Sequence, residues 1–163
     1  MSSHQCCLRG SIQIKPGTAD DVIAAALAPL LDANGLSFDE QLTSGAIELQ
    51  ERDDEQTLNV SIDFWGRGGY SSNEIDDTCK LLDRLVDGHG ALEMVDYDTG
   101  EMDSMITPLF IGESLRERNR ARIDYAIDEA TQWLEPALDA ASLHRIREYI
   151  ASFEPKGEPD RPV

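Results

Sequence analysis

The sequence has few basic residues, few cysteines and no long apolar run, and each shortage excludes a class of protein. Lysine and arginine together number 14 against 32 aspartate and glutamate residues, so the formal net charge is −18 over 163 residues. This charge argues against binding of nucleic acid, heparin or an anionic membrane through a general basic surface. No apolar run approaches the ~20 residues that a membrane-spanning helix needs. The N-terminal residues also lack the charged-then-apolar pattern of a secretion signal.

Cysteines and recognisable catalytic motifs are also scarce. The three cysteines, Cys6, Cys7 and Cys79, are few and odd in number, so they do not form a disulfide framework. This favours a cytoplasmic location. Adjacent cysteines in a strand point to opposite faces, and this works against a zinc site formed by His4, Cys6 and Cys7. The sequence contains no G-x-S-x-G, H-E-x-x-H or C-x-x-C motif. We therefore expect no catalytic residue, no bound metal and no cofactor.

The hydrophobic content of 40% is enough to bury the core of one domain, and its periodicity predicts the fold. Period-2 alternation marks strands and a 3.6-residue period marks helices. The predicted elements are, in chain order, a strand over 8–14, a helix that Thr18 caps and Gly35 ends, a hairpin with arms over 46–50 and 57–65, a helix between Ser71 and Gly88, and a strand over 91–97. A short fifth strand over 105–111 is weakened by Pro108. This β-α-β-β-α-β order predicts a ferredoxin-like α+β fold, with an antiparallel sheet and helices on one face.

Charge divides the chain into two unequal parts. Residues 1–111 hold 6 basic and 21 acidic residues, and residues 112–163 hold 8 basic and 11 acidic residues. We interpret 1–111 as an acidic ferredoxin-like body and 112–153 as C-terminal helices packed on that body. Three prolines and a glycine over 154–163 predict a flexible tail.

The acidic residues are the most informative feature of the body. Asp76, Asp83 and Asp87 follow one another at i, i+7 and i+11 on the second predicted helix, and should form one stripe with Asp77 beside it. Neighbouring helical turns space carboxylates by ~6 Å, roughly as successive phosphates are spaced, so such a surface can imitate a nucleic acid. The alternative is a solvated acidic surface that only keeps the protein soluble.

Acidic residues also gather on the predicted sheet. Glu48, Asp63 and Glu93 should project from one sheet face, and the hairpin turn adds three more charges. Trp65 and Tyr70 flank a glycine-rich loop and could anchor a partner, unless the C-terminal helices cover that face and bury Trp65. The residues predicted to bind a partner are Asp53, Asp54, Glu55, Asp63, Trp65, Tyr70, Asp76, Asp77, Asp83 and Asp87.

Three further segments have a chemical interpretation beside a structural one. The loop Gly66–Ser72 could cradle an anion, but it matches neither dinucleotide nor Walker A spacing, so a flexible turn is favoured. The segment Asp96–Asp103 resembles a cation-binding loop, but its acidic residues do not have the spacing of an EF-hand. A plain hairpin turn is therefore favoured. The arginines over 116–122 favour docking of their helix on the acidic body over an anion or RNA contact.

These observations favour a non-enzymatic, cytoplasmic interaction protein that binds a basic protein or nucleic-acid-binding complex and blocks its nucleic-acid-binding site. In size and acidity the chain resembles small phage-encoded anti-defence proteins, including anti-CRISPR inhibitors, and that resemblance implies inhibition by occlusion. We expect no direct nucleic-acid or membrane binding, and a monomer or homodimer.

Two other functions stay open. The first is an immunity or antitoxin protein that neutralises a basic toxin, and the second is a small enzyme or ligand-binding domain with its site near Gly66–Ser72, Asp96 and Asp98. If the helical stripe binds the partner, reversal of Asp76, Asp83 and Asp87 to lysine should abolish binding and leave stability intact.

Overall fold

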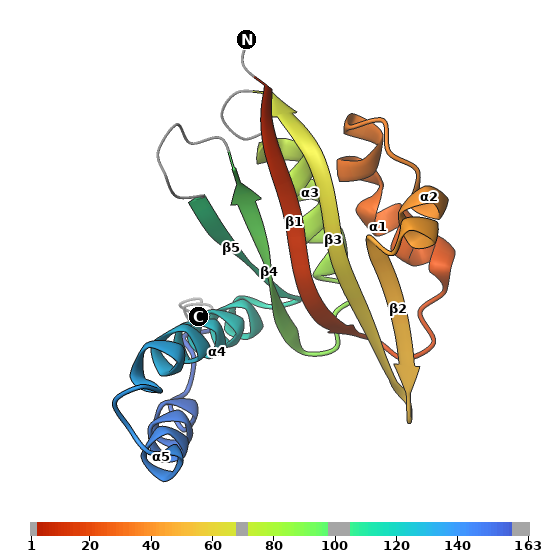
Figure 1. Cartoon of the computed structure of the whole chain (residues 1–163). Helices are drawn as coiled ribbons and strands as arrows, with labels where there is room; N and C mark the ends of the chain where they lie inside the picture. The colour runs from red at the N-terminus through yellow and green to blue at the C-terminus, as the bar shows by residue number, and fades with distance from the viewer. Residues whose placement is uncertain (1–2, 68–71, 98–104, 158–163) are drawn as a thin grey trace, which may run out of the picture.

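The computed structural model describes residues 3–67, 72–97 and 105–157, which form an α+β fold with a five-stranded antiparallel open sheet and five helices (Figure 1). The strands are β1 (Ser3–Ile14), β2 (Ile47–Arg52), β3 (Glu55–Arg67), β4 (His89–Asp96) and β5 (Met105–Gly112). The helices are α1 (Asp20–Ala33), α2 (Phe38–Ser44), α3 (Ser72–Leu82), α4 (Leu115–Leu134) and α5 (Ala140–Ala151). The strands lie in the order β2-β3-β1-β4-β5, so β2 and β5 are the two edges of the sheet.

One face of the sheet packs on α1 and α3 and forms the core. Alternation along β3 directs Leu58, Val60, Ile62 and Phe64 to this core face, as their period-2 spacing predicts, and all four are buried. In β1 the matching register places Leu8 opposite Ile62, so the two central strands share one apolar layer. Buried side chains of α1 and α3 complete the core, among them Ile23, Leu27, Leu30, Ile75 and Leu82.

Helix α4 packs on the opposite face, which we call the outer face, but only over β4 and β5. Glu93 and Phe110 alternate with core-facing neighbours and therefore point to the outer face. The Tyr125 hydroxyl donates a 2.8 Å hydrogen bond to Glu93 Oε1, and the Tyr125 ring packs edge-on against Phe110. The outer face of β1, β2 and β3 has no helix over it in the part of the chain that the structure describes. In Figure 1, α4 and α5 accordingly lie to one side of the sheet, at the lower left.

The element predictions differ from the structure in four places. Residues after Gly35, predicted as a loop, form the short helix α2. The residue that precedes α1 is Ala19, and the Thr18 hydroxyl bonds to the Lys15 carbonyl instead of capping the helix. Helix α3 ends at Leu82, well before Gly88, since the next residues turn to pair with β1. Strand β5 is present despite Pro108, because it is an edge strand. The added α2 and β5 mean that the exact ferredoxin-like order is not confirmed.

Helix α5 and the residues after it contact α4. Arg147 forms a 2.9 Å ion pair with Asp128 and a 2.7 Å hydrogen bond with the Thr131 hydroxyl. Residues 154–157, from the segment predicted as a tail, also return to α4, where Asn119 donates to the Lys156 carbonyl. Among the described residues, no single helix is long and apolar enough to cross a membrane, and the consecutive α1 and α2 pass that test only as a pair bent by 97°.

Replacing Tyr125 with phenylalanine is expected to reduce the loss of stability at alkaline pH. Burial and the hydrogen bond to Glu93 raise the pKa of Tyr125 to about 12, against about 10 for an unfolded tyrosine. The neutral hydroxyl therefore contributes stability below pH 10 that is lost as the pH rises toward 12. Urea unfolding at about pH 9 and about pH 11 measures this difference. An equal loss in both proteins between the two pH values would contradict the assignment.

Candidate protein-binding surface

The β2–β3 hairpin ends in a two-residue turn that presents consecutive carboxylates to solvent. Asp53 and Asp54 have φ values of 44° and 72°, the positive values that a type I′ hairpin turn requires at both central positions. Aspartate tolerates this conformation better than most residues because its short side chain bonds locally. Glu51 and Glu55 flank the turn, and all four carboxylates are on exposed residues. The turn geometry therefore gathers four negative charges at one end of the sheet.

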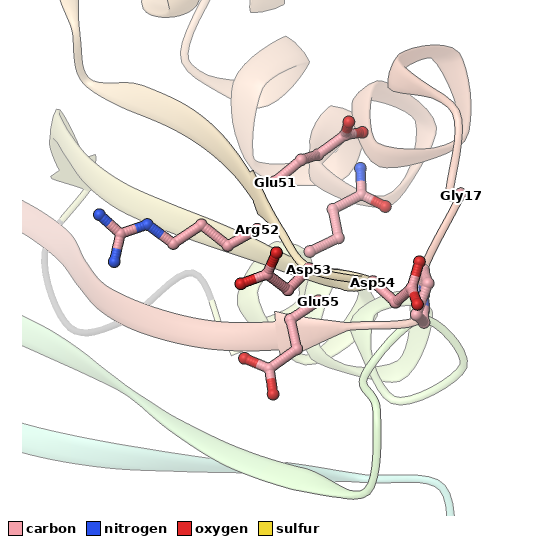
Figure 2. A pocket seen from close by; sticks show the side chains of 8 residues that line it. Gly17, Glu51, Arg52, Asp53, Asp54 and Glu55 are labelled. Atoms are coloured by element: carbon pink, nitrogen blue, oxygen red, sulfur yellow. The ribbon is translucent and has the colours of Figure 1, made fainter.

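A buried glutamine connects this hairpin to the segment that enters α1. The Gln56 side chain is only 3% exposed, and it accepts a 2.9 Å hydrogen bond from the Thr18 amide and donates one of 3.0 Å to the Thr18 carbonyl. This pair of bonds holds the Pro16–Thr18 segment against β3. The two segments enclose an open cavity of about 320 Å³, lined by Pro16, Gly17 and residues 51–56 (Figure 2).

A larger groove of about 610 Å³ lies next to this cavity, along the free edge of β2. Its apolar side chains are Leu42 of α2 with Ile47 and Leu49 of β2, and its carboxylates are Asp20 of α1 with Glu48 and Glu51. Glu51 and Gln56 line both cavities, so the two are neighbours. The result is an acidic groove with an apolar floor beside an edge strand.

The charge of the hairpin end is not neutralised within the described part of the chain. Glu51, Asp53, Asp54 and Glu55 form no ion pair there, and Glu55 accepts a hydrogen bond of 3.4 Å from the side-chain amide of Gln13. Arg52 is the one base in the lining of the cavity, and Figure 2 shows its side chain directed away from the carboxylates. The potential of this region is therefore negative, and a cation of a partner would be attracted to it.

Asp63 and Trp65 lie on the outer face of the sheet, away from the groove. Asp63 is opposite Cys7, and Trp65 is 63% exposed because α4 covers only β4 and β5. The alternative in which the C-terminal helices bury Trp65 is therefore wrong. Glu48, Asp63 and Glu93 share this face, as the strand alternation predicts. Burial, and a hydrogen bond to Asp63, raise the pKa of the Cys7 thiol, so Cys7 stays protonated at neutral pH.

The acidic residues predicted as one helical stripe are separated by the structure. Asp76 and Asp77 are exposed on α3, on the core side of the sheet, and Asp77 pairs with Lys80. Asp83 and Asp87 follow the end of α3, so a stripe at i, i+7 and i+11 does not form. Asp83 accepts a 2.8 Å hydrogen bond from the Gly112 amide, which gives it a structural contact at the start of the C-terminal helices.

The ten predicted partner-binding residues therefore do not share one surface. Asp53, Asp54 and Glu55 are at the hairpin end, and Asp63 and Trp65 are on the outer face. Asp76 and Asp77 are on α3, and Asp83 and Asp87 are in the segment between α3 and β4. Tyr70 lies outside the described residues, with the rest of 68–71 in the loop Gly66–Ser72 and with 98–103 of the segment Asp96–Asp103, whereas Gly66 lies in β3 and Ser72 begins α3. Asp20, Glu51 and Gln56 line the groove and were not predicted, because only the fold brings the start of α1 beside β2.

The arginines of α4 make contacts within the chain. Arg118 donates 2.8 Å to the Gly112 carbonyl and lies 3.5 Å from Asp83, while the Arg122 guanidinium stacks over Phe110. Arg116 pairs with Glu154, and Arg120 donates to the carbonyl groups of Ala151, the last residue of α5, and Phe153. The contacts of Arg118 and Arg122 agree with docking of the helix on the acidic body, the interpretation that the sequence favours, whereas Arg116 and Arg120 hold the C-terminal segment.

Within the described ranges, no group of three or more histidine, cysteine, aspartate or glutamate side chains is arranged to hold a metal ion. Burial raises the pKa of Cys79 to about 12, with smaller contributions from Asp83 and Asp76, so this thiol is also protonated at neutral pH. No family model, curated protein or solved structure matches the chain significantly. The hairpin end and the groove beside β2 are therefore the candidate binding surface of this chain.

Proposed function

We propose that this chain is a non-enzymatic interaction protein that binds a basic partner protein through the hairpin end and the adjoining groove. One observation carries the proposal: Glu51, Asp53, Asp54 and Glu55 are exposed within five consecutive residues and form no ion pair in the described part of the chain. Like charges held this close repel one another, and a partner that supplies lysine or arginine relieves the repulsion. The net charge of −18 extends the attraction beyond the site and speeds encounter with a basic partner.

The finer part of the proposal is that the partner is a nucleic-acid-handling protein whose basic cleft is blocked. A row of exposed carboxylates on a rigid hairpin offers a basic cleft the same charge that a phosphate backbone offers. The carboxylates that line the groove also support the proposal that this surface acts as a nucleic acid mimic. We also propose that β1 to β4 form a ferredoxin-like unit with β5 added at one edge, and that the chain acts in the cytoplasm, which suits three cysteines that form no disulfide.

The proposal is tested by affinity capture from a lysate of the natural host on the immobilised protein. Capture takes place at about 0.05 M salt, and elution uses about 0.5 M salt, across which screening shortens from more than 10 Å to less than 5 Å. The expected result is a basic nucleic-acid-binding protein that elutes with salt. Duplex DNA or RNA added in excess should compete for it, because both ligands occupy one cleft.

Three outcomes contradict the proposal in different ways. Absence of any salt-eluted protein overturns recognition of a basic partner. Capture that nucleic acid leaves unchanged overturns the blocking role and favours the antitoxin alternative. Equal capture by a variant with two hairpin carboxylates removed overturns the assignment to this end of the sheet.

A further inference from the structure

We propose that the free edge of β2 is a strand-addition site, at which an extended, lysine- or arginine-rich segment of a partner protein pairs with the sheet. The inference rests on the proposed function and specifies how the basic partner is held. Its basis is the geometry of the β2 backbone together with the charge and shape of the groove beside it.

Half of the backbone groups of β2 point away from β3. The Ser61 amide donates to the Ala46 carbonyl, which makes Ala46 and Ser61 a hydrogen-bonded pair. Antiparallel strands alternate between bonded and non-bonded pairs, so Ile47, Leu49 and Glu51 direct their N–H and C=O groups to the open side. In the described residues, no other element bonds to these groups. A sheet edge of this kind is a template for another strand.

The groove offers side-chain contacts that match an alternating segment. A strand added beside β2 would place one set of side chains over Leu42 and Leu49, which are only partly buried and line the groove. Carboxylates of Asp20, Glu48 and Glu51 line the same groove. An incoming strand whose apolar side chains cover Leu42 and Leu49 would direct its alternate, basic side chains to the outer face beside Glu48, and a basic residue at its end would reach Glu51 and Asp20. Main-chain bonds would supply affinity and side chains specificity.

Charge also selects between a basic segment and a second copy of this chain. Antiparallel pairing of two β2 edges would bring Glu48 and Glu51 of each copy close to those of the other, and Arg52 alone would oppose them. Like charges across a strand pair are destabilising. The same carboxylates that repel a second copy attract lysine and arginine, so the edge is selective for a basic strand.

Amide hydrogen exchange followed by NMR on the full chain tests the mode of binding. The probe is a ten-residue peptide of alternating lysine and valine, and the control is a peptide of alternating lysine and glycine with equal charge and little tendency to form a strand. We expect the amides of Ile47, Leu49 and Glu51 to exchange quickly in the free protein. The lysine-valine peptide should slow their exchange at least tenfold at saturation, and the control peptide should not.

A proline at an outward-facing position provides a second test. Proline at position 51 removes one outward N–H without removing a bond to β3, which edge strands tolerate. Since Glu51→Pro also removes a charge, Glu51→Gln is its matched control. We expect Glu51→Pro to bind the lysine-valine peptide at least fivefold more weakly than Glu51→Gln does, with both variants folded by circular dichroism.

The possible results separate the two proposals. Tight, salt-sensitive binding of both peptides without slowed exchange at the three amides would overturn strand addition and leave the acidic binding function in place. If neither peptide binds at low salt, the result counts against both the proposed function and strand addition. The three amides could instead exchange slowly without peptide when the protein concentration is raised and the measured mass doubles. That result would show that a second copy of the chain occupies the β2 edge, and it would overturn the proposal that a basic segment of a partner does so.

Discussion

A protein in which Asp53→Asn and Asp54→Gly replace the two turn carboxylates is expected to bind its basic partner at least tenfold more weakly at about 0.1 M salt. Close charge pairs in protein interfaces have coupling energies of about 1.5 kcal/mol or more, so the loss of two pairs could reach about 3 kcal/mol, or roughly 100-fold. The difference should shrink as salt rises to about 0.5 M, because screening weakens the wild-type interaction more than that of the variant.

These substitutions preserve the fold of the hairpin. Asp53 and Asp54 both have positive φ values, and Asn-Gly is the pair that type I′ turns prefer. The variant should therefore unfold at the same or a higher denaturant concentration than the wild type. Isothermal titration calorimetry with the captured partner measures the affinity.

The matched control is a protein with Glu129→Gln and Glu135→Gln, which loses the same charge from exposed residues of α4 and its C-terminal cap. We expect this control to bind within about threefold of the wild type, since net charge alone changes encounter and not the bound contacts. Equal weakening of both variants would show that only total charge matters, and the hairpin would lose its assigned role.

Replacement of Asp83 with lysine is expected to destabilise the protein by about 3 kcal/mol. The Asp83 carboxylate accepts the Gly112 amide at 2.8 Å and lies 3.5 Å from Arg118. Lysine removes the acceptor from a part-buried amide and sets a second cation beside Arg118, and each change costs about 1–2 kcal/mol. The junction has little room to adjust, because a Cβ added at Gly112 would lie 2.8 Å from the Arg118 amide nitrogen.

Asp87→Lys is the matched control for this charge reversal. Asp87 is exposed, and its backbone amide donates to the Gln13 carbonyl, a bond that the substitution retains. Its free energy of unfolding should stay within about 0.5 kcal/mol of the wild-type value. Equal stability of the two variants in urea would show that Asp83 does not hold the start of α4. The structure thus corrects the expectation that all three stripe residues can be reversed without loss of stability.

Much of the secondary structure could be predicted because its signals are local. Alternation predicts β3 and its buried set Leu58, Val60, Ile62 and Phe64, and the polar residues 52–55 predict the hairpin turn between β2 and β3. The end of α3 was predicted too late, since the apolar period continues through Leu85 and Val86. There the chain leaves the helix because the Leu85 carbonyl accepts from Lys15, just after β1, and the Asp87 amide donates to Gln13 of β1, contacts distant in sequence.

The candidate site was predicted only in part. The carboxylates Asp53, Asp54 and Glu55 are consecutive, so their proximity needs no tertiary information. Asp20 and Gln56 could not be assigned to the same groove, because they come together only when the Thr18 segment bonds to the Gln56 side chain. The sequence did not decide whether Trp65 is buried or exposed. Trp65 is exposed because α4 packs over β4 and β5 and does not reach β3.

By itself, the sequence determined that the protein is acidic, that its strands alternate and that its hairpin turn carries consecutive carboxylates, since composition and periodicity belong to the chain before it folds. Only the tertiary structure decided that β2 is an edge strand, that a groove runs beside it and that Asp83 supports the start of the C-terminal helices. The physical reason is that strand order and helix docking come from pairings between residues far apart in sequence. Their energies depend on which surfaces meet, and no local pattern contains that information.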